Sequence, residues 1–314
     1  MKLPESTGSP RVELRQLRYF VTLAEELHFG RAAAREHIVQ SALSQQIQRL
    51  ERALAVPLIA RHARHLALTE AGSRFLIEAR QILAHVERAA TVAQSGGDNG
   101  PVLRIGVLDE GYEAVRPVLH ELLARYPDTE VHLVHAGVPE QCRCLADGRL
   151  DVGVGRASAV PAEIATELFR LDPLGLLVPD GHRLARLAAV PVSMLAGERL
   201  LLPDERQAPE FARFLTDLCR SSGFVPNRYR GSAQGLRPAA DLVARGSCAM
   251  VVPESAVPVA DVRWRPLVQP TPRYPWSLLW RAHDTPRHVG ALVATARRMG
   301  RREGWVTADV GLAS

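Results

Sequence analysis

The chain has 314 residues, of which 46% are hydrophobic, so it can bury sizeable cores in about two or three domains. A formal net charge of +5 permits a polyanionic partner but does not require one. No apolar run reaches the roughly eighteen residues of a membrane span, and residues 1–11 lack the apolar core of a signal peptide. We therefore expect a cytoplasmic protein that does not contact a membrane.

The four cysteines are too few for a disulfide framework in a chain of this length, and they form no CxxC pair and no zinc-type cluster with histidine. We expect no metal and no cofactor. The simplest interpretation is a set of buried structural thiols, with a redox role left open, at Cys142, Cys144, Cys219 and Cys248.

The N-terminal region predicts three short helices after a flexible lead-in over residues 1–12. Leu14, Leu17, Val21 and Ala24 recur at helical spacing and indicate the first helix. A second helix is expected at 31–36, opened by Gly30, and a third follows a tight turn at 38–39. Two short helices and a turn that lead into a third helix are typical of a helix-turn-helix.

The third predicted helix, within residues 37–54, has two contrasting faces. Leu43, Ile47, Leu50 and Leu54 form one apolar stripe at helical spacing. The opposite side carries amides, hydroxyls and guanidiniums, which can pair with base edges and phosphates in a major groove: Gln40, Ser41, Ser44, Gln45, Gln48, Arg49 and Arg52. A polar surface helix is the alternative interpretation of this segment alone.

The segment VPLIARHARHLALT predicts a basic hairpin directly after this helix. Short strands at 57–59 and 66–68 would flank a tip at 61–65 that holds two arginines and two histidines. Arg61 and Arg64 would contact phosphates or the minor groove, as in the wing of a winged helix, unless the hairpin is only a solvated basic turn. Residues 13–69 are thus predicted to form a winged helix-turn-helix domain.

A long helix is predicted at 70–95, with Thr69 as its N-cap. It would span roughly 25 residues and about 37 Å. Its apolar residues form a stripe that one helix alone would leave exposed, so a partner helix and a dimer are expected. The stretch SGGDNGP ends the helix and predicts a hinge at 96–101.

From residue 102 to about 300, strand-like and helix-like patterns alternate. Strands are predicted at 102–108, 131–134, 152–154, 174–178, 200–202, 229–231, 249–252 and 277–282. Helices are predicted at 115–123, 139–146, 210–221, 239–245 and 288–299. This alternation predicts a parallel α/β sheet in two lobes, with a ligand cleft between the lobes and a tail at 301–314.

The sequence resembles the LysR-type transcriptional regulators. The stretch ELRQLRYFVTLAEELHFGRAAAREHIVQSALSQQIQRLERALAVPLIARHARHLALTEAG is similar to their DNA-binding domain, and LRIGV, YPDTEVHLVHAG, GRLDVGVG and LVARGSCAMVVPES are similar to their effector domain. The second half is most similar to regulators of aromatic-compound catabolism.

The resemblance implies an all-α winged helix, a dimerising linker helix and a two-lobed domain shaped like a periplasmic binding protein. It implies a homodimer or homotetramer that binds double-stranded promoter DNA, contacts RNA polymerase and responds to a small-molecule co-inducer. By motif position, Arg31, Arg61 and Arg64 would hold the DNA backbone. The residues implied to face the groove are Gln40, Ser41, Ser44, Gln45 and Arg49.

Three positions depart from the family pattern in the DNA-binding region. The family usually has Ser where this chain has Val39, often Pro where it has Ser41, and commonly Ser or Thr where it has Gly30. Without a hydroxyl at Val39 the third helix lacks its usual N-cap, which costs about 1 kcal/mol unless Ser41 or water compensates.

The predicted effector cleft departs from the family pattern as well. In similar aromatic-pathway regulators a Ser and a Thr hold a ligand carboxylate, and the matching positions here are Glu110 and Val138. With Asp109 adjacent, a dicarboxylate would be repelled, so we hypothesise a neutral or cationic effector, or none. Alternatively, Asp109 only caps its helix and Glu110 points to solvent.

Four further residues complete the predicted effector-binding set. Gly137, Pro203 and Gln234 enter it by family position. Arg156, after the GVG turn, either reaches the cleft or braces it.

Two alternative functions are an enzyme and a redox sensor. An enzyme is disfavoured because GVGR at 153–156 lacks the third glycine of a dinucleotide loop, and no P-loop, HExxH or GxSxG motif occurs. A redox sensor would need Cys219 and Cys248 to lie close together.

Overall fold

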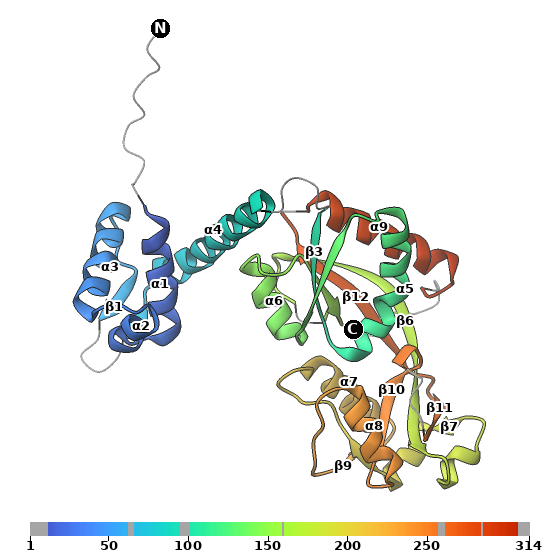
Figure 1. Cartoon of the computed structure of the whole chain (residues 1–314). Helices are drawn as coiled ribbons and strands as arrows, with labels where there is room; N and C mark the ends of the chain where they lie inside the picture. The colour runs from blue at the N-terminus through green and yellow to red at the C-terminus, as the bar shows by residue number, and fades with distance from the viewer. Residues whose placement is uncertain are drawn as a thin grey trace. The chain divides into compact units, whose positions relative to one another are not determined.

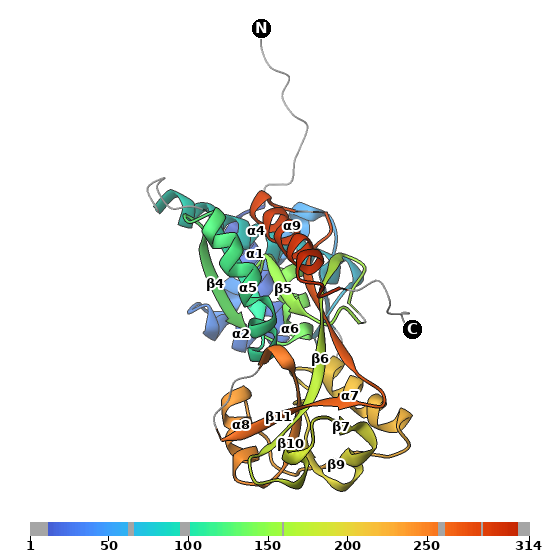
Figure 2. The same ribbon diagram turned by 90° about the vertical axis from the view of Figure 1, so that its right-hand side faces the viewer.

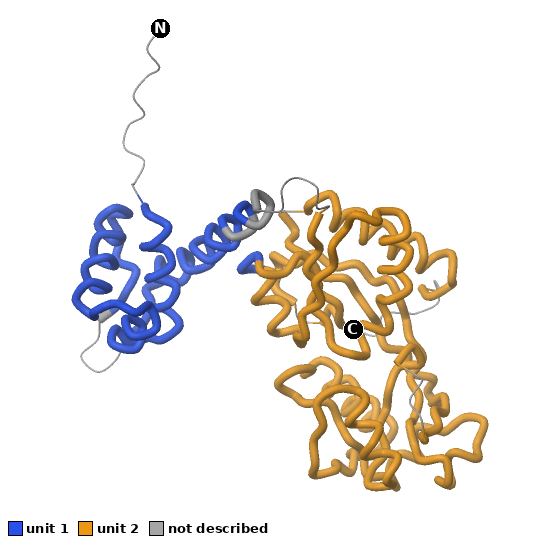
Figure 3. Tube along the Cα trace, viewed as in Figure 1, with its two compact units in different colours: residues 1–98, 146–148 blue, residues 99–145, 149–314 orange. Residues whose placement is uncertain are grey.

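The computed structural model describes residues 12–61, 66–94, 101–158, 160–256, 261–283 and 285–306. The chain divides into two compact units, which are described separately (Figure 3). The N-terminal unit comprises residues 1–98 with 146–148, and the C-terminal unit comprises residues 99–145 with 149–314. Among the described residues, no helix has the length and apolar character needed to cross a membrane.

The N-terminal unit contains three short helices and a small hairpin. The elements are α1 (Leu14–Glu26), α2 (Phe29–Arg35), α3 (Gln40–Leu54), β1 (Ile59–Arg61) and β2 (Leu66–Leu68) (Figure 1). The helices share one core, in which the side chains of Phe20, Leu43, Ile47 and Leu50 are fully buried. The apolar stripe predicted for the third helix is therefore its core face.

The hairpin strand β1 starts two residues later than predicted. Glu51 explains the shift, because its Oε1 accepts hydrogen bonds from Leu58 N–H (2.8 Å) and Ile59 N–H (3.1 Å). Pro57 has no N–H, so strand pairing begins with Ile59 opposite Leu68. Residues 62–65, which include the predicted contact Arg64, lie outside the described residues, as does the side chain of Arg61.

The two helices of the predicted helix-turn-helix begin differently. His28, not Gly30, is the N-cap of α2, and its Nδ1 accepts a hydrogen bond from Arg31 N–H (3.2 Å). Val39 is the N-cap of α3 in extended conformation, and it offers no side-chain hydrogen bond. The predicted loss of the cap at Val39 is therefore confirmed, and this valine is 68% exposed.

The linker helix α4 (Glu70–Gln94) has the predicted bounds to within one residue. Thr69 Oγ1 accepts a hydrogen bond from Gly72 N–H (2.9 Å), as expected of an N-cap. Gly72 lies against the backbone of Leu58, where an added Cβ would be 2.0 Å from the carbonyl oxygen. One side of α4 joins the core through buried Ala79, whereas Ile82 and Val86 are each 41% exposed.

The C-terminal unit consists of two lobes linked by one long strand. The first lobe contains β3 (Val102–Val107), α5 (Asp109–Arg125), β4 (Glu130–His135), α6 (Val138–Ala146) and β5 (Val152–Gly155). The chain then runs through β6 (Ile164–Pro179), whose first half pairs with β12 (Arg273–Arg281). The second half of β6 pairs with β10 (Ala249–Pro253) and β11 (Val262–Val268). Helix α9 (Arg287–Arg302) returns to the first lobe and packs beside α5 (Figure 2).

The second lobe is formed by the part of the chain between β6 and β12, together with the second half of β6. Its helices are η1 (Arg183–Arg186), η2 (Val192–Gly197), α7 (Pro209–Ser221), α8 (Leu236–Ala244) and η3 (Glu254–Ala256). Its strands are β7 (Val190–Pro191), β8 (Arg199–Leu201), β9 (Asn227–Arg228), β10 (Ala249–Pro253) and β11 (Val262–Val268). The predicted two-lobed α/β unit, whose chain returns to the first lobe, is confirmed.

The predicted purely parallel sheet is wrong. Strands β3, β4 and β5 pair in parallel, as do β8, β9 and β10, but β6 and β12 run antiparallel to their neighbours. The strand predicted at 229–231 ends instead at Arg228, and β11 was not predicted. Pro266 lies inside β11, and proline weakens the strand signal in a sequence.

The exposed valine at the start of α3 allows a stability test. Val39→Ser supplies the missing hydroxyl acceptor, so we expect the free energy of unfolding to rise by about 1 kcal/mol. Urea denaturation of the full chain, followed by circular dichroism, measures this change. Val39→Ala is the control, since it alters the side chain without adding an acceptor; an equal effect of both substitutions would contradict the missing cap.

Candidate functional sites

The polar face of α3 is presented to solvent. Gln40, Ser41, Gln45, Gln48 and Arg49 are exposed, and Ser44 is partly buried. Their direction follows from the core, because burial of the apolar stripe on one side of the helix turns these side chains outward. Five of the predicted groove-facing residues thus lie on one continuous surface of the helix, and Gln48 lies among them.

The polar residues at the edges of this face hold the domain together. Gln46 Oε1 accepts a hydrogen bond from Gln16 Nε2 (3.3 Å), and Glu51 binds the start of the hairpin. By contrast, no hydrogen bond or ion pair of the Gln45 or Arg49 side chain is found in the described part of the chain. These two side chains are free to bind an external partner.

Arg31 is exposed at the start of α2 and is held by its neighbour. Its Nε lies 3.1 Å from Glu26 Oε2, and its Nη2 donates to the Glu26 carbonyl oxygen. To bind a phosphate as predicted, the Arg31 guanidinium must either bind Glu26 and the phosphate together or break its contacts with Glu26. The predicted contacts Arg61 and Arg64 remain predictions, since their side chains are not described.

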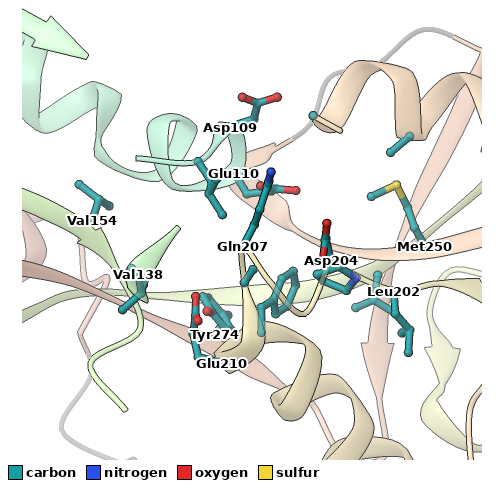
Figure 4. A pocket seen from close by; sticks show the side chains of 18 of the residues that line it. Asp109, Glu110, Val138, Val154, Leu202, Asp204, Gln207, Glu210, Met250 and Tyr274 are labelled. Atoms are coloured by element: carbon teal, nitrogen blue, oxygen red, sulfur yellow. The ribbon is translucent and has the colours of Figure 1, made fainter. Parts of the chain in front are cut away.

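A second candidate site is a cavity of ≈ 90 Å³ between the lobes of the C-terminal unit (Figure 4). Among the predicted effector-binding residues, Asp109, Glu110, Val138 and Pro203 line it. Polar residues that the sequence did not indicate also line it: His135, Gln141, Asp204, Gln207 and Glu210.

Three predicted residues lie outside the cavity lining. The Arg156 guanidinium lies over the Phe214 ring, 4.9 Å from its centroid, so it braces the second lobe. Gln234 is exposed between the lining residues Ala233 and Gly235. Gly137 packs on the other lobe, where an added Cβ would be 1.7 Å from the carbonyl oxygen of Gln207.

Asp109 joins the two lobes. Its Oδ2 accepts a hydrogen bond of 2.9 Å from Leu236 N–H, the first residue of α8. The alternative in which Asp109 caps its own helix is wrong, because Leu108 is the N-cap of α5 and Asp109 supplies an acceptor to the opposite helix. His135 Nδ1 lies 3.6 Å from Asp109 Oδ1 on the same side of the contact.

Glu110 and Glu210 face the cavity from opposite lobes. Both are partly buried, and burial raises the pKa of each carboxyl above its usual range. For Glu110 the neighbouring Asp109 charge raises the pKa further, and for Glu210 the Arg156 charge opposes the rise. The alternative in which Glu110 points to solvent is therefore wrong. Glu210 was missed because its sequence context is an ordinary first helical turn.

The cysteines give no support to a redox sensor. Cys219 and Cys248 lie in two different hydrophobic clusters. Burial raises the pKa of the Cys219 thiol to about 11, and it also raises the pKa of Cys248 and Cys142. Thiols with raised pKa values are weak nucleophiles, as expected of structural cysteines.

The close contact at Gly137 gives a test of the interlobe packing. Gly137→Ala should force the lobes apart at Gln207 and destabilise the chain by about 2 kcal/mol, as overpacking of a tight contact does. Thermal unfolding measures the loss. Gly181→Ala is the control, because a Cβ there meets no atom within 4 Å; equal stability of the two variants would contradict the contact.

Comparison with known proteins places both units in one family. Residues 14–73 match the model for "Bacterial regulatory helix-turn-helix protein, lysR family", and residues 96–301 match the "LysR substrate binding domain". The uncharacterized HTH-type transcriptional regulator YnfL of Escherichia coli (strain K12) is 35% identical over 280 residues, which cover 87% of this chain and 93% of that protein.

Another relative is the probable cat1 operon transcriptional activator of Acinetobacter lwoffii, which is 30% identical over 92% of this chain and 96% of its own length. Among solved structures, CbnR complexed with its target DNA is similar with a TM-score of 0.57 and 27% identity, covering 92% of this chain and all of that one (100%). Full-length BenM is similar with a TM-score of 0.59 and 27% identity, covering 95% of this chain and 100% of that one. The chain thus belongs to the LysR family of DNA-binding transcriptional regulators, with the family's helix-turn-helix and effector-binding domains.

Proposed function

We propose that this LysR-family regulator reads promoter DNA with the polar face of α3, and that a small molecule in the interlobe cavity changes this binding or the bending of the DNA. The observation that carries the proposal is the polar face of α3. Gln45 and Arg49 project from it without a partner among the described residues, while Leu43, Ile47 and Leu50 on the opposite face of the same helix are fully buried.

The chemistry of this face suits base recognition. An amide such as that of Gln45 can donate to and accept from an adenine edge, and Arg49 can bind guanine or a phosphate. Arg31, Arg61 and Arg64 would hold the backbone and give a sequence-independent share of the affinity. The similarity to CbnR, whose structure includes its target DNA, supports the same use of this domain.

The effector is proposed to be neutral or cationic. Asp109, Glu110, Asp204 and Glu210 line the cavity, and its described lining contains no arginine or lysine. A carboxylate ligand would meet like charges there without a compensating cation. The Asp109–Leu236 contact joins the lobes beside the cavity. A ligand that widens the cavity would therefore shift one lobe against the other. This shift would change how the regulator binds DNA or contacts RNA polymerase.

The linker helix is proposed to pair with a second copy of the chain. Ile82 and Val86 lie one turn apart on the same side of α4 and are each 41% exposed. A second α4 would bury them, and paired reading helices would suit the paired half-sites of a promoter. Two such dimers would form the proposed homotetramer.

The reading and holding roles predict different losses of DNA binding. Gln45→Ala should reduce affinity for a preferred duplex by roughly 5- to 100-fold while leaving non-specific affinity unchanged. Arg61→Ala or Arg64→Ala should weaken binding to all duplexes and lower the slope of log affinity against log salt by about one. Fluorescence anisotropy with a duplex selected from a random pool, and with a scrambled one, separates these effects.

The control for this experiment is Gln234→Ala, an exposed glutamine in the other unit. An equal loss on both duplexes for Gln45→Ala would contradict its reading role. A wild-type chain that binds no duplex at low ionic strength would overturn the proposed function.

The proposed dimer predicts an effect of charge on α4. Ile82→Glu should place a carboxylate in the helix pair and dissociate the assembly, as sedimentation velocity would measure. Ser73→Glu adds the same charge on the opposite side of α4 and should leave the assembly intact. An unchanged sedimentation coefficient for Ile82→Glu would rule out pairing through this side.

A further inference from the structure

The interlobe cavity has an aromatic wall. Phe211, Tyr274 and Trp276 line it, and their rings pack on one another. The Phe211 and Tyr274 centroids are 4.6 Å apart, and those of Tyr274 and Trp276 are 4.8 Å apart with nearly perpendicular planes. Phe211 lies on α7 of the second lobe, and the other two rings lie on β12, which pairs with β6. The wall is therefore held by the second lobe and by the β6–β12 strand pair together.

Carboxylates complete the lining opposite and beside these rings. Glu110 enters from α5 of the first lobe, and Asp204 and Glu210 enter from the second lobe (Figure 4). No cationic side chain lies within ion-pair distance of Glu110 or Glu210 in the described part of the chain. Arg156, whose charge acts on Glu210, lies over Phe214 and is absent from the described lining, whereas His135 belongs to the lining and its charge acts on Glu110.

A buried polar atom in the wall lacks a partner. Tyr274 is 1% exposed and lines the cavity. Trp276 is 5% exposed, and its buried Nε1–H has no acceptor among the described residues. Buried polar groups in folded proteins are almost always satisfied, so the unpaired Trp276 N–H indicates a ligand or water that supplies an acceptor. An ammonium group has no acceptor, so this acceptor would belong to the remainder of the ligand or to water.

We propose that this cavity binds a small organic ammonium ion, held on the aromatic faces and paired with Glu110 and Glu210. The inference rests on the proposed effector role of the cavity and names the class of molecule. Aromatic faces attract cations through their quadrupole, and the attraction is strongest at desolvated sites. Carboxylates without a cation partner supply the opposite charge from two sides, so the ligand links the lobes.

The volume limits the size of the charged group. At ≈ 90 Å³ the cavity is smaller than the cavity of about 150 Å³ that accommodates benzene in another protein. Tetramethylammonium has about the molecular volume of benzene, so the volume alone does not distinguish a methylated ammonium from a flat aromatic ligand, and the charge of the lining decides between them. The bulkier remainder of a natural ligand would have to extend beyond the enclosed part.

The test is calorimetric titration of the full chain, without DNA, with tetramethylammonium chloride. tert-Butyl alcohol serves as a compact neutral ligand and sodium benzoate as an aromatic anion, all at one ionic strength set with sodium chloride. We expect saturable binding of tetramethylammonium, at least about tenfold weaker binding of tert-butyl alcohol, and none of benzoate. Binding of benzoate or tert-butyl alcohol that equals or exceeds that of tetramethylammonium overturns the proposal, and so does the absence of binding by all three.

Two variants tie the binding to this cavity. Glu110→Gln and Glu210→Gln should each weaken tetramethylammonium binding by about tenfold and leave tert-butyl alcohol unaffected. Asp217→Asn, an exposed position on α7 paired with Arg220, is the matched control and should bind like the parent. Thermal unfolding of each variant verifies that it is folded. Unchanged tetramethylammonium affinity in both folded glutamine variants overturns the proposal.

The result is independent of DNA binding. If the chain binds DNA but not tetramethylammonium, the proposed ligand class is wrong and the proposed DNA-binding function stands. If it binds tetramethylammonium but no duplex, the proposed reading of DNA fails and the cation site remains.

Discussion

Burial of one side of α3 determines how the N-terminal unit can act. Leu43, Ile47 and Leu50 are fully enclosed by α1, α2 and the hairpin, and this packing leaves the helix a single orientation. The polar side is therefore exposed by the same interaction that stabilises the fold. A fully buried leucine contributes about 1.5–3 kcal/mol, so rotation of this helix would cost more than any hydrogen bond that the polar side could gain.

In the C-terminal unit the corresponding constraint is the strand pair β6 and β12. Because β6 belongs to the sheets of both lobes, the lobes can move only by bending this connection. Asp109 at α8 and Gly137 against Gln207 add direct contacts near the cavity. The cavity is thus small, and a ligand bound in it would act directly on the contacts that hold the lobes together.

Much of the fold could be predicted from the sequence, and the strands that were predicted wrongly or missed have physical explanations. The stripe of α3 and the bounds of α4 were predictable because helical periodicity is a local property. The antiparallel strand β12 was placed in a parallel sheet because strand direction depends on partners far away in the chain. The first half of β6 was missed, since its residues Thr166, Glu167 and Arg170 interrupt the apolar run.

The residues of the two sites also differ in whether local sequence could identify them. Glu110 could be identified because it matches a ligand-binding position of similar regulators, whereas Glu210 and Tyr274 reach the cavity from elements about 100 residues or more further along the chain. Arg156 was predicted as a possible contact, but its guanidinium packs on Phe214, which no spacing rule could show. The interlobe role of Asp109 depends on Leu236, 127 residues away.

Photo-cross-linking from the polar face of α3 tests whether this face lies against the bases of bound DNA. A photoreactive amino acid placed at exposed Gln48, in the full chain bound to its selected duplex, should cross-link to DNA bases within the protected site. The same group at exposed Gln234 should give no cross-link to bases. Cross-links to bases from position 234 and none from position 48, with the duplex still bound, would contradict the account.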